Sequence, residues 1–340
     1  MKNGKLGVCI IGCGFMGGIH GERWNQLPQA EIVAVVDILE DRASKFMRLY
    51  HLDGYYTDYH LAASLPEVDV VSICVPTCLH AEMTIFCMEH GKHVLCEKPI
   101  ALNLEQAQGM VAAAEQYPVQ LGIGFMRRHS PVMDTLRDMF KSGKILHPVI
   151  YHASDIRQVR PKLAMHDVFQ NGGPVVDMAV HLIDTWRCVF QSEPVQVFAQ
   201  GLTLGEGRPE LEQVANLAID SAVITVTFAS GDIGNFNVSW GLPPGVNPPG
   251  NPDHIYTPSG LVEVTWSMNH QSLCLLPEGG EWKTLVESDE DQYQKQISTF
   301  ADCIMEEKKF PATAQDGIHA LRVAQAALQS IKTGKAVYLT

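Results

Sequence analysis

The segment "GCGFMGGIHG", residues 12–21, constrains the fold of this chain more than any other. It places Gly12, Gly14 and Gly17 at the spacing G-x-G-x-x-G. The apolar stretch "LGVCII" precedes it, a helix-compatible stretch follows, and a second apolar stretch, "AEIVAVVD", ends at Asp37. Apolar, β-branched stretches of this kind are typical of buried parallel strands. A strand, a glycine turn, a helix and a second strand, with an acid about 20 residues after the last glycine, form the context of a dinucleotide-binding fingerprint.

Each glycine has a physical role in such a cradle. Gly12 permits a tight turn, Gly14 lets the backbone approach a pyrophosphate, and Gly17 allows the helix and the strand to pack closely. The helix offers free N–H groups to the phosphates at its N-terminus, where Phe15 and Met16 stand. The alternative is that the glycines serve only a turn. The flanking strands and the acid favour the cradle.

Asp37 is predicted to select NAD. Its carboxylate can accept hydrogen bonds from the adenosine ribose hydroxyls, and it would repel the 2′-phosphate of NADP. The next residue, Ile38, offers no positive charge, whereas Arg42 could in principle swing in toward a phosphate. We therefore expect NAD as the cofactor, with NADP as the less favoured alternative.

The pattern of strands and helices changes near residue 124. Before it, strand-like stretches alternate with helix-like ones, which predicts a parallel sheet with right-handed crossovers. After it, strand-like stretches follow one another without long helices between them, which predicts an antiparallel sheet. The predicted fold is α/β. A Rossmann dinucleotide-binding domain at 1–124 precedes an α+β domain at 125–340, which has a large open, mostly antiparallel sheet for substrate binding and oligomerisation.

Composition and charge argue against several classes of partner. Lysine and arginine total 25 against 38 aspartate and glutamate, a net charge of −13, which argues against nucleic acid or an anionic membrane. No apolar run approaches the roughly 18 residues of a membrane span, and the N-terminus lacks a signal-peptide pattern. The nine cysteines are scattered and form no C-x-x-C motif. We therefore expect buried thiols, a cytoplasmic location and no metal site.

Three polar clusters stand at predicted strand ends or in the second domain. They are "VPTCLH" (75–80), "CEKP" (96–99) and "NGGPVVDMAVHLID" (171–184). The combination of "EKP" with "GG…D…H" resembles the family of glucose–fructose oxidoreductase and inositol dehydrogenase, the Gfo/Idh/MocA family. The resemblance covers essentially the whole chain, including the C-terminal "FADCI…FPATAQDGIHALRVAQAALQS". It implies a Rossmann domain, then an open antiparallel sheet with helices on one face.

Asp177 and His181 are spaced i, i+4, so on one helix both side chains would point the same way. Pro174 suits the first turn of that helix, and an imidazole can take a proton from a substrate hydroxyl at neutral pH. The resemblance implies that His181 is the acid/base and Asp177 its partner on the substrate. It also implies that Lys98 orients the reacting hydroxyl, with a Lys98–Pro99 bond that is often cis. The alternatives are a core-packed histidine, a first-turn acid favoured by the helix dipole, and an exposed strand-end lysine.

Three further residues are assigned to the cofactor side by the same resemblance. Glu97 is expected to approach the nicotinamide side of the pocket. Thr77 stands where many members of the family have asparagine, and its hydroxyl can still contact the cofactor. His80 matches a histidine of the family after the same turn, and packing or capping is the favoured explanation for it.

The substrate side is assigned from "GFMRRHSP" (124–131), which resembles inositol dehydrogenases. The first arginine faces the polyol there, so Arg127 is the candidate and Arg128 is expected to be structural; a surface arginine pair is the alternative. Asp155 begins "DIR" where inositol enzymes tend to carry His-Arg-Asn. His166 lies in "LAMHDVFQNGG", which lacks the tryptophan of many sugar dehydrogenases, and it is a further candidate. These departures leave the chemistry intact and the substrate open.

The predicted function is NAD-dependent hydride transfer at a secondary hydroxyl of a cyclic sugar or polyol. One alternative is a relative that uses bound NAD catalytically to cleave or epimerise glycosides. The other is a non-catalytic protein that senses a sugar or a dinucleotide. Because one face of an open sheet needs a cover, we expect a homodimer or homotetramer through the strands at 210–275. The proline-rich stretch at 241–260 is predicted to be a loop, either a lid or an oligomer contact.

Overall fold

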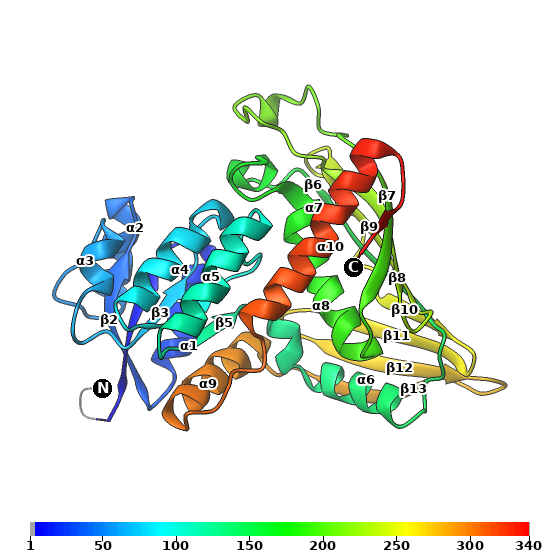
Figure 1. Cartoon of the computed structure of the whole chain (residues 1–340), viewed down its shortest axis with the longest axis horizontal. Coiled ribbons are helices and arrows are strands. Elements are labelled where there is room, and N and C mark those ends of the chain that lie inside the picture. The colour runs from blue at the N-terminus through cyan, green and yellow to red at the C-terminus, as the bar shows by residue number, and fades with distance from the viewer. Residues whose placement is uncertain (1–3, 340) are drawn as a thin grey trace. The chain divides into compact units, whose positions relative to one another are not determined.

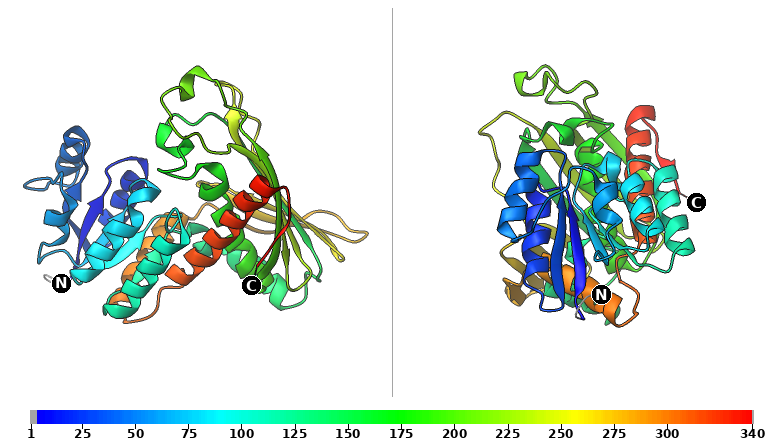
Figure 2. Two further views of the ribbon diagram at one scale, coloured as in Figure 1. Left: turned by 45° about the horizontal axis from the view of Figure 1, so that its top comes forward. Right: turned by 90° about the vertical axis from the view of Figure 1, so that its left-hand side faces the viewer.

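The computed structural model describes residues 4–339, which form two compact units (Figures 1 and 2). The first unit holds the chain up to Met126 together with Gln292–Ile318, and the second holds Arg127–Asp291 together with the chain from His319 onward. The main boundary lies close to the expected residue 124. The expected second domain, however, included 292–318, which packs with the first unit instead.

Contacts inside the first unit explain why the late segment joins it. The side chain of Gln29 donates to Asp302 at 3.1 Å, and the backbone N–H of Ile123 donates to the carbonyl of Ala312 at 2.9 Å. Gly122 leaves space for Phe310, because a Cβ there would lie 2.7 Å from that ring. Because these contacts join residues far apart in the sequence, no local sequence pattern shows that 292–318 belongs to the first unit.

The first unit is built on a five-stranded sheet in the order β2-β1-β3-β4-β5, with every pair parallel. Nearly every residue of its strands is buried, because helices cover both faces of such a sheet. The strands are β1 Leu6–Ile11, β2 Ala30–Val36, β3 Val70–Ile73, β4 His93–Cys96 and β5 Leu121–Ile123. The predicted Rossmann sheet is confirmed.

The helices of the first unit alternate with these strands, as predicted. They are α1 Phe15–Asn25, α2 Glu40–Leu49, α3 Tyr59–Ala63, α4 His80–Glu89 and α5 Leu104–Gln116, followed late in the chain by α9 Gln292–Met305. Asparagine caps α5, since the Asn103 side chain accepts from the backbone N–H of Gln106. The five-residue α3 was not predicted, because it is too short to show a helical period.

The second unit is built on a nine-stranded sheet in the order β13-β12-β11-β10-β6-β9-β8-β7-β14. Every pair is antiparallel except β6 with β9. The strands are β6 Ile150–Gln158, β7 Pro194–Leu202, β8 Ser221–Phe228, β9 Ile233–Leu242, β10 Asp253–Thr257, β11 Gly260–Trp266, β12 Gln271–Pro277, β13 Lys283–Ser288 and β14 Val337–Tyr338. The large, mostly antiparallel sheet is confirmed. Strands β10, β13 and β14 were not predicted.

Strand β10 corrects the prediction that 241–260 is all loop. The last proline before it is Pro252, after which Asp253 and Ile255 turn inward as buried residues. Tyr256 pairs with both β6 and β11. The prolines therefore mark only the loop before the strand, since proline cannot donate to a sheet.

Helices line one face of the large sheet and bury an aromatic core against it. They are α6 Pro131–Lys141, α7 Gly173–Asp177 and α8 Ala179–Phe190, with the later part of α10 Ala314–Thr333. Trp186 on α8 lies 6.1 Å from Tyr151, and Phe190 lies 5.0 Å from Phe228, measured between ring centroids. A Cβ on Gly234 would lie 2.4 Å from Trp186, so glycine in β9 makes room for the indole.

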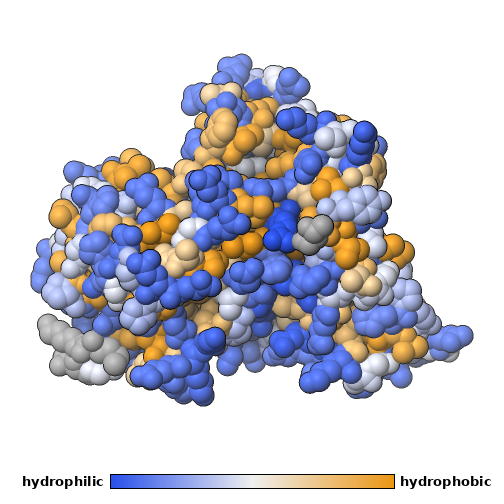
Figure 3. All heavy atoms as spheres, in the orientation of Figure 1, coloured by the Kyte–Doolittle hydropathy of each residue, from blue (hydrophilic) through white to orange (hydrophobic). Residues whose placement is uncertain are grey.

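The outer face of the large sheet carries exposed apolar side chains. Phe198 on β7 is 40% exposed, Leu202 is 54% exposed, and Val223 on β8 is 52% exposed. The strand register places these three side chains on the same face. On the side of the molecule drawn in Figure 3, apolar atoms form several separate patches among polar ones. Within residues 4–339 no helix has the length and apolar composition that a membrane crossing needs.

Candidate functional site

The glycine turn after β1 has the geometry of a phosphate cradle. Gly12 has φ of +94°, and a Cβ there would lie 2.6 Å from the carbonyl oxygen of Cys74, so only glycine fits. A Cβ on Gly17 would lie 1.8 Å from the carbonyl oxygen of Gly12, which shows how closely α1 approaches the turn. Gly14 is the N-cap of α1, and a Cβ there would meet no described atom within 4 Å. The missing side chain leaves open space at a helix N-terminus, where a pyrophosphate fits.

The first turn of α1 is accessible beside that space. Phe15 is 76% exposed, and Met16 is partly exposed. No side chain caps α1 at Gly14, so the N–H groups of the first turn remain available to a ligand. The residues present therefore fit the phosphates of a dinucleotide.

Asp37 follows β2 and is fixed by two backbone N–H groups. Its Oδ2 accepts from Cys13 and its Oδ1 from Leu39, both at 2.9 Å. Each oxygen keeps a further lone pair for a ribose hydroxyl. Ile38 is 82% exposed and brings no charge. Burial and the charge of Asp37 raise the pKa of Cys13 to about 12, and Arg42 opposes that shift, so Arg42 lies within electrostatic range of the turn.

Glu97, the first residue of "EKP", ends a chain of buried hydrogen bonds inside the first unit. Trp24 Nε1 donates to Ser72 Oγ at 2.8 Å, and Ser72 Oγ lies 3.1 Å from His20 Nδ1. His20 Nε2 donates to Glu97 Oε1 at 3.0 Å, and the backbone N–H of Lys98 donates to Oε2 at 3.2 Å. Because an indole N–H can only donate, the Ser72 hydroxyl keeps its proton for Nδ1. Each of the side-chain polar groups in this hydrogen-bond network, from Trp24 to Glu97, therefore has a partner.

The charge of Glu97 is stabilised inside the protein. Burial alone would raise its pKa, but the hydrogen bond from His20 and the charge of Lys98 lower it instead. A Cβ on Gly124 would lie 2.8 Å from Glu97 Oε1, so a glycine makes room for the carboxylate. The ionised carboxylate holds the backbone at the end of β4. A direct contact between Glu97 and nicotinamide stays a prediction.

The turn that carries Lys98 is held from a second side by His80. The Lys98–Pro99 bond is cis, as the resemblance implies. His80 Nδ1 lies 2.7 Å from the carbonyl oxygen of Pro99, and Nε2 lies 3.1 Å from that of Val75. Burial lowers the pKa of His80, and the contacts with the two carbonyl oxygens oppose that shift. His80 thus ties two strand-end turns together, which supports packing over chemistry; Thr77 is buried in the same region.

Asp177 and His181 lie on either side of a helix junction and not on one continuous helix. Asp177 ends α7, Met178 links the helices, and His181 is the third residue of α8. The backbone N–H of His181 donates to the carbonyl of Met178 at 3.2 Å, an i→i−3 bond that interrupts the α-helical pattern. Both side chains are buried. Asp177 is not a first-turn acid of either helix, so the dipole explanation for it does not apply.

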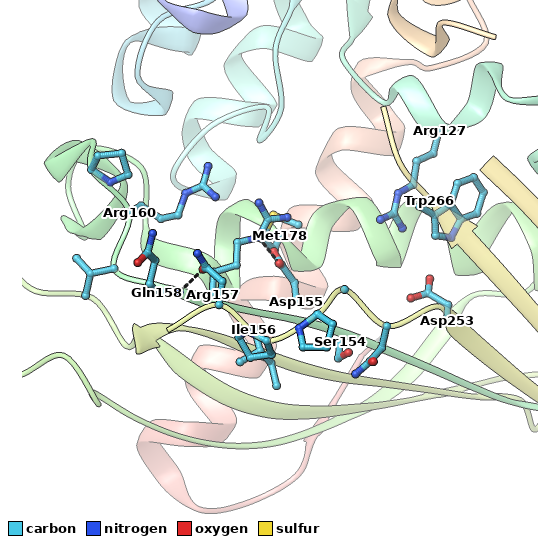
Figure 4. A pocket seen from close by; sticks show the side chains of 17 residues that line it. Arg127, Ser154, Asp155, Ile156, Arg157, Gln158, Arg160, Met178, Asp253 and Trp266 are labelled. Carbon is cyan, nitrogen blue, oxygen red and sulfur yellow. Dashed lines mark hydrogen bonds and ion pairs between the residues drawn. The ribbon is translucent and has the colours of Figure 1, made fainter. Parts of the chain in front are cut away.

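The second unit contains a cavity of about 500 Å³ (Figure 4), within the roughly 300–1,000 Å³ typical of small-molecule sites. Its wall comes mainly from residues 154–161 and from the proline-rich loop at 247–251, with Arg127, Met178 and Trp266. The helix junction that bears the predicted catalytic pair is therefore part of the wall. Two prolines of the stretch predicted to be a lid or an oligomer contact, Pro248 and Pro249, line this cavity.

Arg127 packs against Trp266 at one end of the cavity, with its guanidinium carbon 4.9 Å from the ring centroid (Figure 4). Its Nε and Nη1 are buried and have no hydrogen-bond partner among the described residues. Trp266 Nε1 donates to the Tyr151 hydroxyl at 3.2 Å, which donates to Asp253 Oδ2 at 3.0 Å. Burial raises the pKa of Asp253 to about 6, and Arg127 opposes that shift. Arg127 can satisfy its N–H groups with a ligand oxygen.

Asp155 faces the middle of the cavity (Figure 4). Its Oδ1 accepts from Nε of Arg157, while its Oδ2 is buried and finds no hydrogen-bond partner within residues 4–339. An acceptor without a donor suits a substrate hydroxyl. The structure therefore brings Arg127 and Asp155, both predicted substrate residues, into one cavity.

His166 takes a different position from the one expected of a substrate residue. The described wall of the cavity does not include it. It is buried, its Nε2 accepts from the backbone N–H of Arg160 at 3.0 Å, and its ring meets Trp240 edge-on at 6.3 Å. His166 therefore holds the segment that carries Arg160, and substrate contact by His166 itself stays untested.

Arg128 has the structural role that was expected. Its Nε donates to Asp184 Oδ2 at 2.9 Å, and its Nη2 also contacts that carboxylate. Asp184 is 2% exposed and lies on α8, three residues after His181. A bidentate pair of this kind fixes the helix in place.

Sequence reasoning missed several residues of the cavity wall. Arg157 and Arg160 left a signal, "RQVRP", in which two arginines stand three residues apart. Asp253 was hidden in the proline-rich stretch, and Trp266 ends a strand far along the chain. Only the sheet pairing brings these positions together.

Comparisons with known proteins match both units. Residues 6–125 match the model of an oxidoreductase family with an NAD-binding Rossmann fold, and residues 133–253 match the model of the Gfo/Idh/MocA C-terminal domain. The expected cofactor class and the resemblance are both confirmed.

Individual relatives extend the likeness along nearly the full chain. The chain is 28% identical to the myo-inositol 2-dehydrogenase of Thermotoga maritima over 342 residues, which cover 98% of each chain. It is 26% identical to a scyllo-inositol 2-dehydrogenase (NAD(+)) of Bacillus subtilis, over 98% of this chain and 96% of that one. The aldose–aldose oxidoreductase of Caulobacter crescentus shares the fold, with a TM-score of 0.86, 23% identity, and coverage of 98% of this chain and 100% of that one. The chain therefore belongs to the Gfo/Idh/MocA family of oxidoreductases, and its first unit is the family's NAD-binding Rossmann domain.

Proposed function

We propose that this chain transfers a hydride between a secondary hydroxyl of a cyclic sugar or polyol and C4 of the nicotinamide of NAD. The junction of α7 and α8 carries this proposal, because it bears Asp177 and His181 while its linking residue, Met178, lines the cavity. The cavity also presents N–H groups of Arg127 and an oxygen of Asp155 that lack hydrogen-bond partners among the described residues. Unused donors and acceptors on one wall match the hydroxyls of a polyol.

The protein's own groups handle the proton. NAD supplies the hydride acceptor when it is bound. His181 takes the hydroxyl proton as the hydride leaves, which requires the neutral imidazole. Asp177, one turn away, holds a substrate hydroxyl or fixes the imidazole tautomer. Lys98, the third proposed catalytic residue, is assigned from the resemblance of "EKP" and orients the reacting hydroxyl.

NAD is proposed over NADP because of the residues after β2. Asp37 can accept from the ribose hydroxyls, and the exposed Ile38 brings no charge to a 2′-phosphate. The double variant Asp37→Ser, Ile38→Arg should move the preference toward NADP in steady-state kinetics with both cofactors. A wild-type protein that used NADP tenfold better than NAD would contradict this assignment.

A substrate panel tests the reaction class. Inositols, aldoses and glycosides are offered with NAD, and the absorbance of NADH is followed. Oxidation of at least one polyol or sugar, with NADH accumulating in proportion, is the expected result. If every one of these compounds, and also the corresponding sugar acids and sugar phosphates, were inert, the proposal would be overturned. Conversion of a glycoside without accumulation of NADH would favour an enzyme that recycles bound NAD.

We further propose a cytoplasmic homodimer or homotetramer. The exposed Phe198, Leu202 and Val223 support an interface on the outer face of the large sheet, since such patches are rarely left to solvent. The proposed interface would then include β7 as well as β8, so it would lie partly outside the expected range of 210–275. Within residues 4–339 none of the nine cysteines forms a disulfide, which suits a reducing compartment. Light scattering that gave a monomer at micromolar concentration would contradict the oligomer.

A further inference from the structure

We propose that the substrate carries a negatively charged group, a carboxylate or a phosphate, which is bound by Arg160 together with Arg157. The proposal rests on the proposed oxidation of a sugar or polyol and narrows its substrate class. It predicts a sugar acid or a sugar phosphate, with its charged group at the end of the cavity opposite Arg127 and its hydroxyls toward Asp155.

The wall of the cavity has an excess of positive charge. It contains three guanidinium groups and two carboxylates, which gives 3 − 2 = +1 when all are ionised. Asp155 pairs with Arg157. Asp253 lies in the field of Arg127, which opposes the rise of its pKa. The two carboxylates of the wall are thus close to Arg157 and Arg127, and no third carboxylate of the wall remains to balance the charge of Arg160.

The surroundings of Arg160 show the same imbalance. Its Nε is buried and has no hydrogen-bond partner in the described part of the chain. Burial lowers the pKa of Arg160, the charge of Arg157 lowers it further, and the opposing effects of Asp155 and Asp177 do not restore it. A guanidinium that is partly desolvated and short of anions gains most from an anionic ligand, because charge-assisted hydrogen bonds are about twice as strong as neutral ones.

Arg160 is also held in place, as a binding residue needs to be. Its guanidinium carbon lies 5.7 Å from the centroid of the Trp240 ring. Its backbone N–H donates to the buried His166. These contacts fix the side chain and its segment before any ligand arrives, which reduces the entropy lost on binding.

The layout of the cavity gives the charged group its position. Figure 4 shows Arg157 and Arg160 toward one end and Arg127 with Trp266 toward the other, with Asp155 and Met178 between them. Asp177 is among the charges that act on Arg160, so the anion would lie within electrostatic range of the proposed catalytic pair. A monosaccharide could place its charged group at the arginines and a ring hydroxyl near the helix junction.

The test compares neutral compounds with their charged counterparts. Glucose, glucuronate and glucose 6-phosphate form one set, and myo-inositol with its 1-phosphate forms another. Binding is measured by calorimetry on the protein saturated with NADH, so that no turnover interferes, and oxidation is measured separately with NAD. The variants are Arg160→Met and Arg160→Lys, with Arg137→Met as the matched control on the exposed surface of α6.

At least one acid or phosphate should bind about 10- to 100-fold more tightly than its neutral counterpart. Arg160→Met should remove that preference, Arg160→Lys should keep part of it, and Arg137→Met should leave it unchanged. Which of the two charged compounds binds more tightly identifies the group as carboxylate or phosphate. If Arg160→Met does not fold, Arg160→Lys still decides, because its dissociation constant for the anion should rise while that for the neutral compound stays constant.

Two results separate this proposal from the proposed function. Oxidation of neutral sugars with no preference for charged ones, or binding of anions that is indifferent to Arg160, would overturn the anion site and leave the hydride transfer standing. Tight binding of an acid that depends on Arg160, without any oxidation by NAD, would support the anion site and contradict the hydride transfer.

Discussion

Glu97 in the first unit and Asp253 in the second are both buried carboxylates, but their pKa values are shifted in opposite directions. Glu97 accepts from His20 and from the backbone of Lys98, and its pKa is lowered. Asp253 accepts from the Tyr151 hydroxyl, and burial raises its pKa to about 6. The first acid belongs to a closed network of donors and acceptors. The second stands in a cavity whose polar groups are still partly unsatisfied.

The difference indicates what each region does before a ligand binds. The turn that carries "EKP" is held by hydrogen bonds within the protein. The cavity of the second unit keeps unused hydrogen-bonding capacity at Arg127 and Asp155, which a substrate can complete. Pre-organised support and open binding groups are complementary requirements of a catalytic site.

The largest expected effect tests the closed network. His20→Leu would remove the partner of a buried acid, which typically costs about 3–5 kcal/mol of unfolding free energy. Urea unfolding at pH 7 measures it. The control is His60→Leu, because His60 is an exposed histidine of the same unit that pairs with the exposed Asp58, and its midpoint should hardly change. Equal midpoints for the two variants would show that the network does not stabilise the first unit.

The second prediction uses the opposite pKa shifts. Because the folded pKa of Asp253 is raised, the stability it gives is present below its unfolded pKa of about 3.9 and is lost as pH rises through about 6. Asp253→Asn should therefore gain about 2 kcal/mol relative to wild type between pH 4 and pH 7. Urea unfolding at the two values measures the change.

Glu97 provides the counterpart to that measurement. Its folded pKa is lowered, so the stability it gives is present above its unfolded pKa of about 4.3 and is lost as pH falls through the folded value. Glu97→Gln should be destabilising at pH 7 and less so as the pH falls toward 4. If both variants responded to pH in the same direction, the contrast between the two acids would be wrong.

The third and smallest prediction separates ligand binding from folding within the glycine turn. A Cβ on Gly14 meets no described atom within 4 Å, so Gly14→Ala should leave the melting temperature unchanged. It should still weaken NAD at least about tenfold, or about 1.4 kcal/mol, because the side chain would enter the space for the pyrophosphate. Gly54→Ala, at a glycine with equally open surroundings, should change neither quantity. Unaltered NAD affinity in Gly14→Ala would argue against this position for the cofactor.

The first unit could be predicted in detail because its chemistry lies in one short segment. Gly12 and Gly17 have the steric roles that the fingerprint implies, and Asp37 stands at the end of β2 as expected. Backbone geometry set by consecutive residues leaves a local pattern. The hydrogen-bond network around Glu97 leaves no such local pattern, because His20 and Ser72 are brought close to Glu97 only when the sheet forms.

The cavity of the second unit was harder to predict for the same reason. Arg127 and Asp155 were proposed as substrate residues, but Arg160, Asp253 and Trp266 come from segments that only the strand order brings together. The prolines up to Pro252 indicate the loop before β10, and they led to the prediction that the strand itself was also loop. Single charged residues show no period, so sequence alone does not reveal which of them share a wall.

The central claim is that His181 of the second unit handles the proton for a hydride transfer to NAD. The most direct measurement is the steady-state kinetics of His181→Ala on the substrate that the panel identifies, with NAD binding followed separately. His270→Ala, at an exposed histidine of the same unit, is the matched control. The account predicts a fall in kcat of about 10²- to 10⁴-fold with NAD affinity nearly unchanged, and a normal kcat in the control. A kcat near that of wild type in His181→Ala would remove the histidine from catalysis and contradict the mechanism.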